Sequence, residues 1–150
     1  MKIQLAYGKR GLPIEIAERN LVKVLSMKAV DPLPDPYIQF TKSFLRPIGV
    51  HQSLFDMAKR KKTACIVICD ITRPVPNRQL LPPILKVLHA AGLTHLDISI
   101  LIATGVHRPN LGDELSELVG ADIARDYRIF NHNARERKSH RRLPECLTSH

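Results

Sequence analysis

Features typical of membrane and secreted proteins are missing from this sequence of 150 residues. No apolar run approaches the roughly 18 residues that a membrane-spanning helix needs. The N-terminus, MKIQLAYGKRG, has an early lysine but no apolar segment after it, so it does not resemble a secretory signal. These absences argue against a transmembrane helix and a signal peptide, and we expect a cytoplasmic protein without a membrane partner.

Cysteine is scarce as well, with three residues in the chain: Cys65, Cys69 and Cys146. On one extended strand, the Cα atoms of Cys65 and Cys69 would lie about 13 Å apart, well beyond the ~7 Å that a disulfide tolerates. We therefore expect both to be free thiols that pack in the core. No Cys or His pair has the spacing of a metal site, so the sequence predicts no self-sufficient metal site.

The sequence has no Trp and 5% aromatic residues, whereas basic residues are plentiful. Lys and Arg number 23 against 14 Asp and Glu, and the net charge of +9 favours an anionic partner. The basic runs at 59–62 and 135–142 are either solvated faces or contacts to a polyanion. Proteins that bind single-stranded nucleic acid usually add stacking aromatics, and these runs contain none. A nucleic-acid partner is therefore not favoured over a smaller ligand that carries phosphate or carboxylate.

Hydrophobic residues make up 44% of the chain and charged residues 25%, which is an ordinary composition for about one globular domain. Residues 3–7 and 12–16 alternate apolar and polar side chains around a Gly-Lys-Arg-Gly turn, which predicts a β-hairpin. Between 30 and 50, four prolines indicate an irregular connection with at most a short helix after Asp35. Ser53 is expected to cap another short helix.

The centre of the chain predicts an α/β fold. Two apolar runs, 64–69 and 98–103, indicate buried strands at 64–69 and 97–103, and a helical segment at 77–91 lies between them. Strands joined through a helix form a βαβ unit, in which the strands are parallel and covered on both faces. A further strand is expected at 127–130. We therefore predict a parallel-sheet βαβ core preceded by an N-terminal β-hairpin.

Two helix boundaries follow from local sequence. Pro82 and Pro83 lie well inside the central helical segment, where each would remove a hydrogen-bond donor and clash with the preceding turn. We therefore expect this helix to begin near Leu81, with the prolines in its first turn. Farther along the chain, Asn110 is expected to cap an amphipathic helix that runs through Val119.

Polar residues follow the two central strands, at the positions where each strand is predicted to end. Ligands of parallel sheets bind outside the carboxyl ends of the strands, so neighbouring strands would bring these residues to one edge. Neither loop has a glycine-rich phosphate-binding pattern. The residues at this edge whose side chains could bind a ligand or transfer a proton are Asp70, Thr72, Arg73, Thr104, His107 and Arg108.

Each of these residue types has a use at such an edge. Arg73 and Arg108 carry planar charged forks that suit a carboxylate or a phosphate. The two threonines could donate hydroxyl hydrogen bonds to the same groups, and Asp70 could orient an arginine or accept from a ligand hydroxyl. His107 is the side chain suited to moving a proton at neutral pH. Alternatively, Asp70 and Arg73 belong to an ordinary turn with a surface ion pair, and His107 has no catalytic role.

The two loops resemble the signature loops of an enzyme family. Cys-Asp-Ile-Thr-Arg-Pro-Val-Pro-Asn-Arg at 69–78 and Ile-Ala-Thr-Gly-Val-His-Arg-Pro at 102–109 are similar to those of the nickel-dependent lactate racemases. Tyr-Gly at 7–8 and Asn-His-Asn-Ala at 131–134 fit the same pattern, and the similarity covers residues 1–137. The resemblance implies an α/β fold with two domains that face each other across the active site. This chain would be most of the first domain.

The resemblance also implies a cofactor and residue roles. Family members use a nickel-pincer nucleotide, nickel-pyridinium-3,5-bisthiocarboxylate mononucleotide, to racemise a 2-hydroxy acid by hydride transfer. Arg73 and Arg108 would hold the substrate carboxylate, and His107 would be one of two catalytic histidines that act as general bases. The residues that would contact the cofactor are Asp70, Ile71, Thr72 and Arg73.

The sequence departs from this family after residue 137. Family members continue well beyond the Asn-His-Asn-Ala segment, and that part carries the second catalytic histidine, the lysine joined to the cofactor and the histidine that completes nickel coordination. We expect residues 1–137 to be an incomplete lactate-racemase-like N-terminal domain, and 138–150 to be a disordered basic tail that matches no family pattern. Such a chain would lack its C-terminal domain and be inactive alone. The alternatives are a phosphate-, nucleotide- or partner-binding module without catalysis, and a nucleic-acid-binding domain.

Overall fold

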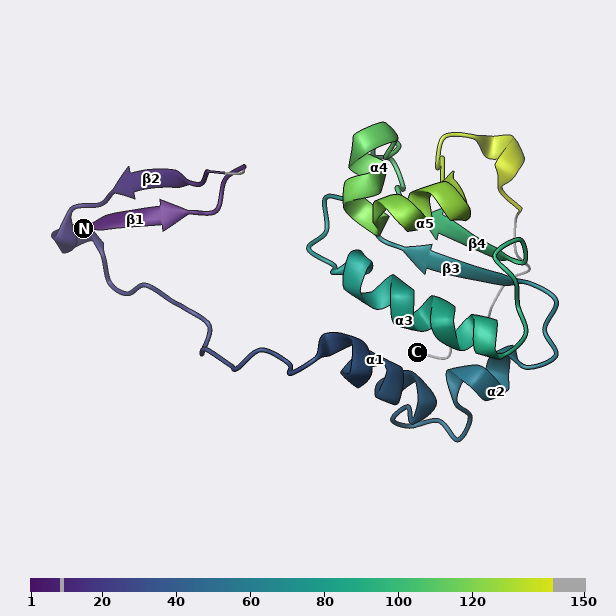
Figure 1. Cartoon of the computed structure of the whole chain (residues 1–150). Coiled ribbons are helices and arrows are strands. Elements are labelled where there is room, and N and C mark those ends of the chain that lie inside the picture. The colour runs from purple at the N-terminus through teal and green to yellow at the C-terminus, as the bar shows by residue number, and fades with distance from the viewer. Residues whose placement is uncertain (9, 142–150) are drawn as a thin grey trace, which may run out of the picture. The chain divides into compact units, whose positions relative to one another are not determined.

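The computed structural model describes residues 1–8 and 10–141 (Figure 1). The chain divides into two compact units, one of Met1–Pro32 and one from Leu33 onward. Most of the tail predicted at 138–150 lies outside the described residues. Within the described ranges, no helix is both long enough and apolar enough to cross a membrane.

The first unit is an antiparallel hairpin. β1 (Lys2–Leu5) pairs with β2 (Leu12–Glu15), so the alternating sequence forms the hairpin that it predicted. Gly11 permits the turn, because its φ is +72° and a side chain there would collide with that of Gln4. A single turn of 3-10 helix, η1 (Glu18–Asn20), follows the second strand.

Two helices open the second unit. α1 (Pro36–Leu45) begins after Asp35, whose carboxylate accepts a hydrogen bond from a first-turn amide at 3.1 Å. The sequence predicted at most a short helix here, whereas α1 runs for ten residues. α2 (Leu54–Ala58) starts at the predicted Ser53 cap, which forms a capping box with Asp56.

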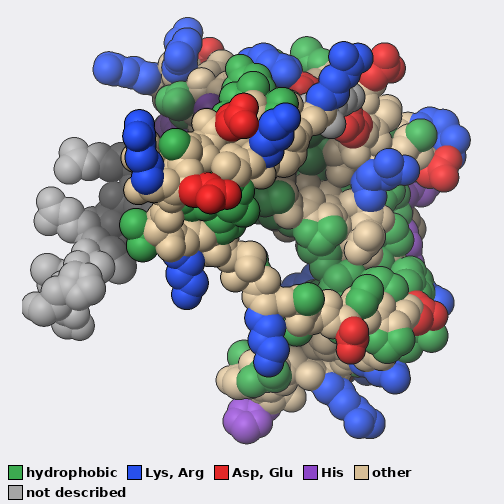
Figure 2. Space-filling view, turned by 90° about the vertical axis from the view of Figure 1, so that its left-hand side faces the viewer, with side chains coloured by type: hydrophobic (Ala, Val, Ile, Leu, Met, Phe, Trp, Pro, Cys, Tyr) green, Lys and Arg blue, Asp and Glu red, His purple; other side chains and the backbone are tan. Residues whose placement is uncertain are grey.

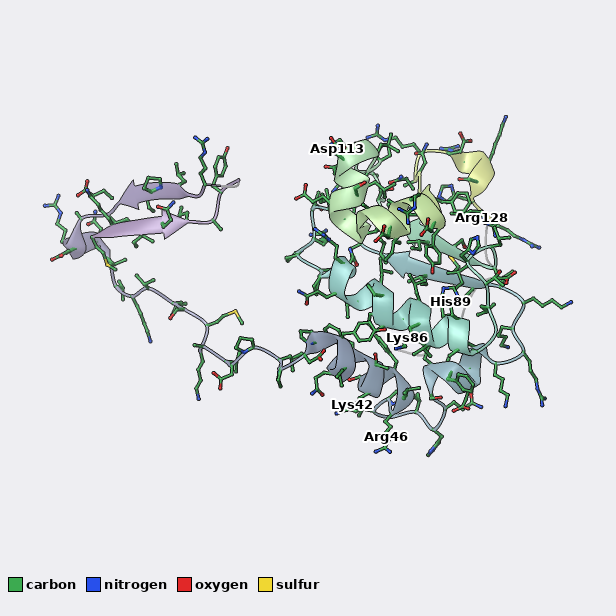
Figure 3. The ribbon with its side chains drawn as sticks, in the orientation of Figure 1. Lys42, Arg46, Lys86, His89, Asp113 and Arg128 are labelled. Atoms are coloured by element: carbon green, nitrogen blue, oxygen red, sulfur yellow. The ribbon has the colours of Figure 1, made fainter. Side chains whose placement is uncertain are left out.

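Tertiary contacts hold α1 and the central helix α3 (Asn77–Ala90) together. The ammonium group of Lys86 on α3 lies 5.5 Å from the centre of the Tyr37 ring on α1, which is a cation–π contact (Figure 3). Near the end of α3, one ring nitrogen of His89 bonds to a backbone carbonyl at 2.7 Å and the other to the Tyr127 hydroxyl at 2.6 Å. His89 is thus a structural residue that ties α3 to the segment before the last strand.

The second unit is built on a three-stranded parallel sheet (Figure 1). Its strands are β3 (Ala64–Ile68), β4 (Ile98–Ile102) and β5 (Arg128–Asn131), in the order β3-β4-β5. β3, α3 and β4 form the predicted βαβ unit, and the strands of this unit are adjacent and parallel. The strand predicted at 127–130 begins and ends one residue later and pairs with β4. The predicted α/β fold with an N-terminal hairpin is confirmed.

Alternate strand residues build the core on one face of the sheet. Ile98, Ile100 and Ile102 of β4 have 0% of their surface exposed. The helices over this face are α3, α4 (Gly112–Val119) and α5 (Ala121–Asp126) (Figure 1). Each buried leucine or isoleucine side chain contributes about 1.5–3 kcal/mol, so this core is the main source of stability. Its buried helix residues are Leu81, Leu85, Leu88, Leu118, Val119 and Ile123.

On the opposite face of the sheet, two apolar side chains are exposed. Val67, Leu101 and Phe130 form one row across the three strands, and Val67 and Phe130 keep 62% and 54% of their surface exposed. Cys65 points to this face, and both it and Cys69 are exposed free thiols. The prediction of free thiols is confirmed, but the prediction that they pack in the core is wrong. Successive strand residues point to opposite faces, and an unbroken apolar run does not show which face is covered.

The predicted start of α3 is wrong. The helix begins at Asn77 rather than near Leu81, and Pro82 and Pro83 lie inside it. An interior proline costs about 3 kcal/mol. Asn77, Leu81 and Leu85 are nevertheless buried at helical spacing, with Leu81 only 1% exposed, so packing of this helix face against the sheet offsets the cost.

Candidate active site

The carboxyl ends of β3 and β4 meet at one edge of the sheet, because the two strands are adjacent and parallel. Asp70 lies in the loop after β3, and His107 lies in the loop after β4. The Oδ2 atom of Asp70 is 2.6 Å from the Nδ1 atom of His107, although the residues are 37 positions apart in the sequence. The prediction that the two loops share one edge is confirmed.

Asp70 is buried, with 4% of its surface exposed, and both of its carboxylate oxygens have partners. Its Oδ1 accepts hydrogen bonds from the Thr72 amide at 2.9 Å and from the Thr72 hydroxyl at 2.5 Å, while Oδ2 faces His107. These contacts, with the Thr72 hydroxyl first and His107 second, lower the pKa of Asp70 from 3.8 to about 2. Asp70 is therefore an ionised carboxylate at neutral pH.

The ionised carboxylate determines which nitrogen of the His107 ring carries the proton. A carboxylate can only accept hydrogen bonds, so Nδ1 of His107 carries a proton and donates a hydrogen bond to Asp70. In the neutral ring, the other nitrogen, Nε2, then holds the lone pair. The His107 side chain is 46% exposed and lines a hollow of about 690 Å³. No described residue hydrogen-bonds to its Nε2, which is therefore left for a ligand or water.

Both threonines that sequence analysis assigned to ligand binding donate within the protein. The Thr72 hydroxyl donates to Asp70. Thr104, with 3% of its surface exposed, donates its hydroxyl to the His132 carbonyl in the loop after β5. These side chains therefore hold parts of the site in place.

The two arginines at this edge differ in what they contact. Arg108 donates two hydrogen bonds to the Glu114 carboxylate at 2.6 and 2.7 Å. This pairing raises the pKa of Arg108 and lowers that of Glu114. Arg73 is exposed, and its guanidinium has no hydrogen bond or ion pair with a described residue. Arg73 is thus the arginine with a free charged fork.

Two asparagines have roles at this edge that the local sequence did not predict. Asn110 does not cap α4, because that helix begins at Gly112 without a side-chain cap. The buried Asn110 side chain instead accepts a hydrogen bond from the Ile71 amide at 3.3 Å. Asn131 exchanges two hydrogen bonds with the backbone of Asn110. Asn131 ends the third parallel strand, so the rule that predicted the first two loops could also have pointed to it.

The described residues offer few features of a metal site or of a polyanion-binding surface. In residues 1–8 and 10–141, no group of three or more His, Cys, Asp or Glu is arranged to hold a metal ion. His132 and His140 form a pair with their Nε2 atoms 3.0 Å apart. On the face shown in Figure 2, Lys and Arg side chains are interspersed with Asp and Glu rather than gathered in one patch.

Comparisons with known proteins identify relatives. A sequence model of the lactate racemase N-terminal domain matches residues 7–147. The chain is 30% identical over 137 residues to the lactate racemase of Thermoanaerobacterium thermosaccharolyticum, which covers 89% of this chain and 31% of that protein. It is 34% identical over 132 residues to the lactate racemase of Lactiplantibacillus plantarum, which covers 87% of this chain and 31% of that protein.

A solved structure agrees with these sequence matches. The structure of the lactate racemase apoprotein from Thermoanaerobacterium thermosaccharolyticum matches with a TM-score of 0.71 and 28% identity, over 92% of this chain and 31% of that chain. The chain thus spans about a third of the length of the relatives that it matches. Because the domain match extends over most of the sequence and the fold agrees, the chain belongs to the lactate racemase N-terminal domain family.

Proposed function

We propose that this chain supplies one half of the active site of a 2-hydroxy acid racemase, the half that moves the hydroxyl proton on one side of the substrate. The observation that carries the proposal is the contact between Asp70 and His107 at the carboxyl edge of a parallel sheet. Its relatives are lactate racemases, which makes lactate or another small 2-hydroxy acid the proposed substrate.

His107 is the proposed general base. With Nδ1 donating to Asp70, Nε2 takes the proton from the substrate hydroxyl and later returns one. The pKa of Asp70 is about 2, so this residue stays ionised and its charge stabilises the imidazolium that forms. Thr72 holds the carboxylate through its amide and its hydroxyl, so the ring of His107 is oriented against a fixed partner.

Arg73 is the proposed anion-binding group. A guanidinium fork binds a carboxylate or a phosphate through two parallel hydrogen bonds, and the fork of Arg73 has no partner among the described residues. These are the anions that a hydroxy acid and a nucleotide would bring. Arg108 would first have to release Glu114, so we assign the substrate carboxylate to Arg73, with Arg108 joining only when that pair opens.

The residues at this edge fit the anionic groups of a nickel-pincer nucleotide. Arg73 would hold such a group, whereas Asp70, Ile71 and Thr72 already have partners within the protein and would support the loop around it. The described residues contain no cluster that would ligate the nickel. When bound, the pyridinium ring of the nucleotide supplies the chemistry of accepting a hydride from the substrate carbon.

Inversion of a 2-hydroxy acid needs proton transfer on both sides of the substrate carbon, and His107 can serve one side. The second group must therefore come from elsewhere. This chain spans about a third of the length of its relatives. We assign the second group to the remaining part of a longer racemase. By the same reasoning, the chain alone would not racemise its substrate.

The test is a chimera in which residues 1–137 replace the matched segment of the Lactiplantibacillus plantarum enzyme. Produced in cells that make the family's cofactor, the chimera should form D-lactate from L-lactate. His107→Ala should lower kcat roughly 10²–10⁴-fold, which is the usual contribution of a general base. An active chimera that is indifferent to this substitution would refute the role of His107. A chimera that retains the nucleotide without turnover would instead favour a binding module.

A further inference from the structure

We propose that Asn110 and Asn131 form a clasp that positions the Asp70–His107 pair by joining the loops that follow β3, β4 and β5. The catalytic meaning of this clasp rests on the proposed function, but its structural effect can be measured without activity. Asn110 lies in the loop after β4 and has 2% of its surface exposed, and Asn131 is the last residue of β5.

Two hydrogen bonds join the side chain of Asn131 to the backbone of Asn110. The backbone amide of Asn110 donates to Oδ1 of Asn131 at 2.8 Å, and Nδ2 of Asn131 donates to the backbone carbonyl of Asn110 at 3.1 Å. The side-chain amide of one residue thus pairs with the backbone of the other, as a neighbouring strand would. This pairing fastens the loop after β4 to the end of β5.

The side chain of Asn110 reaches the other loop as well. Its Oδ1 accepts from the amide of Ile71 at 3.3 Å, and its Nδ2 donates to the Glu114 carboxylate at 3.0 Å. Ile71 directly follows Asp70 in the chain. Two described hydrogen bonds join the loop after β3 to the loop after β4, the one from Ile71 to Asn110 and the one between Asp70 and His107. The clasp therefore fixes the spacing across which Asp70 meets His107.

Asparagine suits this position because its amide offers both an acceptor and donors. An aspartate at 110 would set a second carboxylate against Glu114, and an apolar residue would leave the Ile71 amide without its partner, which is costly in a partly buried place. A purely structural role would affect the stability of the fold alone. A positioning role predicts a change at the ring of His107, with which neither asparagine shares a hydrogen bond in the described part of the chain.

The experiment asks which ring nitrogen of His107 carries the proton, by long-range ¹⁵N–¹H NMR of the labelled chain at a pH where the ring is neutral. The signals of His107 are assigned by their loss in His107→Ala. The parent chain should show the proton on Nδ1. In Asn110→Ala, this signature should be lost in favour of the Nε2–H form that a free imidazole prefers.

A matched control is Asn77→Ala. Asn77 is also a buried asparagine, 3% exposed, but it lies on α3 and its Nδ2 has no partner among the described residues. This substitution should leave His107 unchanged. If Asn110→Ala does not fold, as judged by amide dispersion, Asn131→Asp serves instead, because it keeps the acceptor for the Asn110 amide and puts a carboxylate oxygen in place of the donor to the Asn110 carbonyl.

A folded Asn110→Ala or Asn131→Asp chain with the Nδ1 proton of His107 unchanged would overturn the proposal. An equal change in Asn77→Ala would also overturn it, because the effect would then be unspecific. In an active chimera, Asn110→Ala should lower kcat with little effect on the KM for lactate. A chimera that is inactive in every form would count against the proposed function, while the NMR result would still decide the clasp.

Discussion

Replacing Thr72 by valine tests the hydrogen bonds at the centre of the candidate site. Valine keeps the shape of threonine and removes the hydroxyl that donates to Asp70 at 2.5 Å, the largest cause of the low pKa of Asp70. The hydrogen bond from the Thr72 amide and the contact with His107 remain. We therefore expect the pKa of Asp70 to rise from about 2 to a value that stays below 3.8, the ordinary value of its carboxyl.

The assay is an NMR titration of the side-chain carboxyl carbon of Asp70 in the labelled chain. Thr94→Val is the matched control, because the Thr94 hydroxyl donates to Asp97 at 2.6 Å and is the largest cause of the lowered pKa of that carboxyl. The control should raise the pKa of Asp97 and leave Asp70 unchanged. A folded Thr72→Val chain with an unchanged Asp70 titration would refute the role of the Thr72 hydroxyl in lowering the pKa of Asp70.

The same substitution has a consequence for stability in acid. A carboxyl whose pKa is lowered by folding stabilises the native state above its unfolded pKa, which is near 3.9, and this stabilisation is lost as the pH falls toward the folded value. For Asp70, the lower end of this pH range is its folded pKa of about 2. The parent chain should lose unfolding free energy across this pH range, and Thr72→Val should lose less. Urea unfolding at several pH values compares the two, and equal losses would contradict the assignment.

Arg73, the isolated chain and the exposed apolar row on the sheet each allow a direct test. In the chimera, Arg73→Lys should raise the KM for lactate more than it lowers kcat, because lysine cannot form the bidentate pair; an unchanged KM would remove Arg73 from substrate binding. The 150-residue chain alone, supplied with nickel and mature cofactor, should form no D-lactate from L-lactate; turnover would mean that His107 is not limited to one side of the substrate. Val67→Lys combined with Phe130→Lys should reduce the binding of a hydrophobic dye and any self-association, because both side chains are exposed on the apolar row. Val22→Lys, at a fully exposed residue of the first unit, is the control and should change neither.

The positions of the two site loops could be predicted from the sequence, because they depend on where the strands end. The apolar runs at 64–69 and 98–103 indicated two strands, and the helix between them required the strands to be parallel. From that alone, Asp70 and His107 could be placed at one edge, which the 2.6 Å contact confirms. The family resemblance rested on the same two loops, and the domain match over residues 7–147 confirms it.

The partners of the polar side chains were not predictable in the same way. A threonine hydroxyl or an arginine fork binds a ligand and a protein carboxylate equally well, so the local sequence could not show that Thr72 donates to Asp70 or that Arg108 pairs with Glu114. The prediction that Asn110 caps a helix was wrong for the same reason, because its side chain accepts a hydrogen bond from Ile71 in another loop.

By itself, the sequence determined the α/β class, the hairpin, the parallel strands and the edge at which the polar loops gather, because each follows from apolar periodicity and from turns within a few residues. Only the tertiary structure decided that α3 keeps its two prolines, that Val67 and Phe130 are exposed on the sheet and that Asn110 joins two loops. The contacts between the loops join residues far apart in the sequence: Asp70 and His107 are 37 positions apart, and Ile71 and Asn110 are 39 apart. These side chains and amides come within hydrogen-bonding distance because β3 and β4 pair in register. A pattern of neighbouring residues cannot predict such a long-range contact.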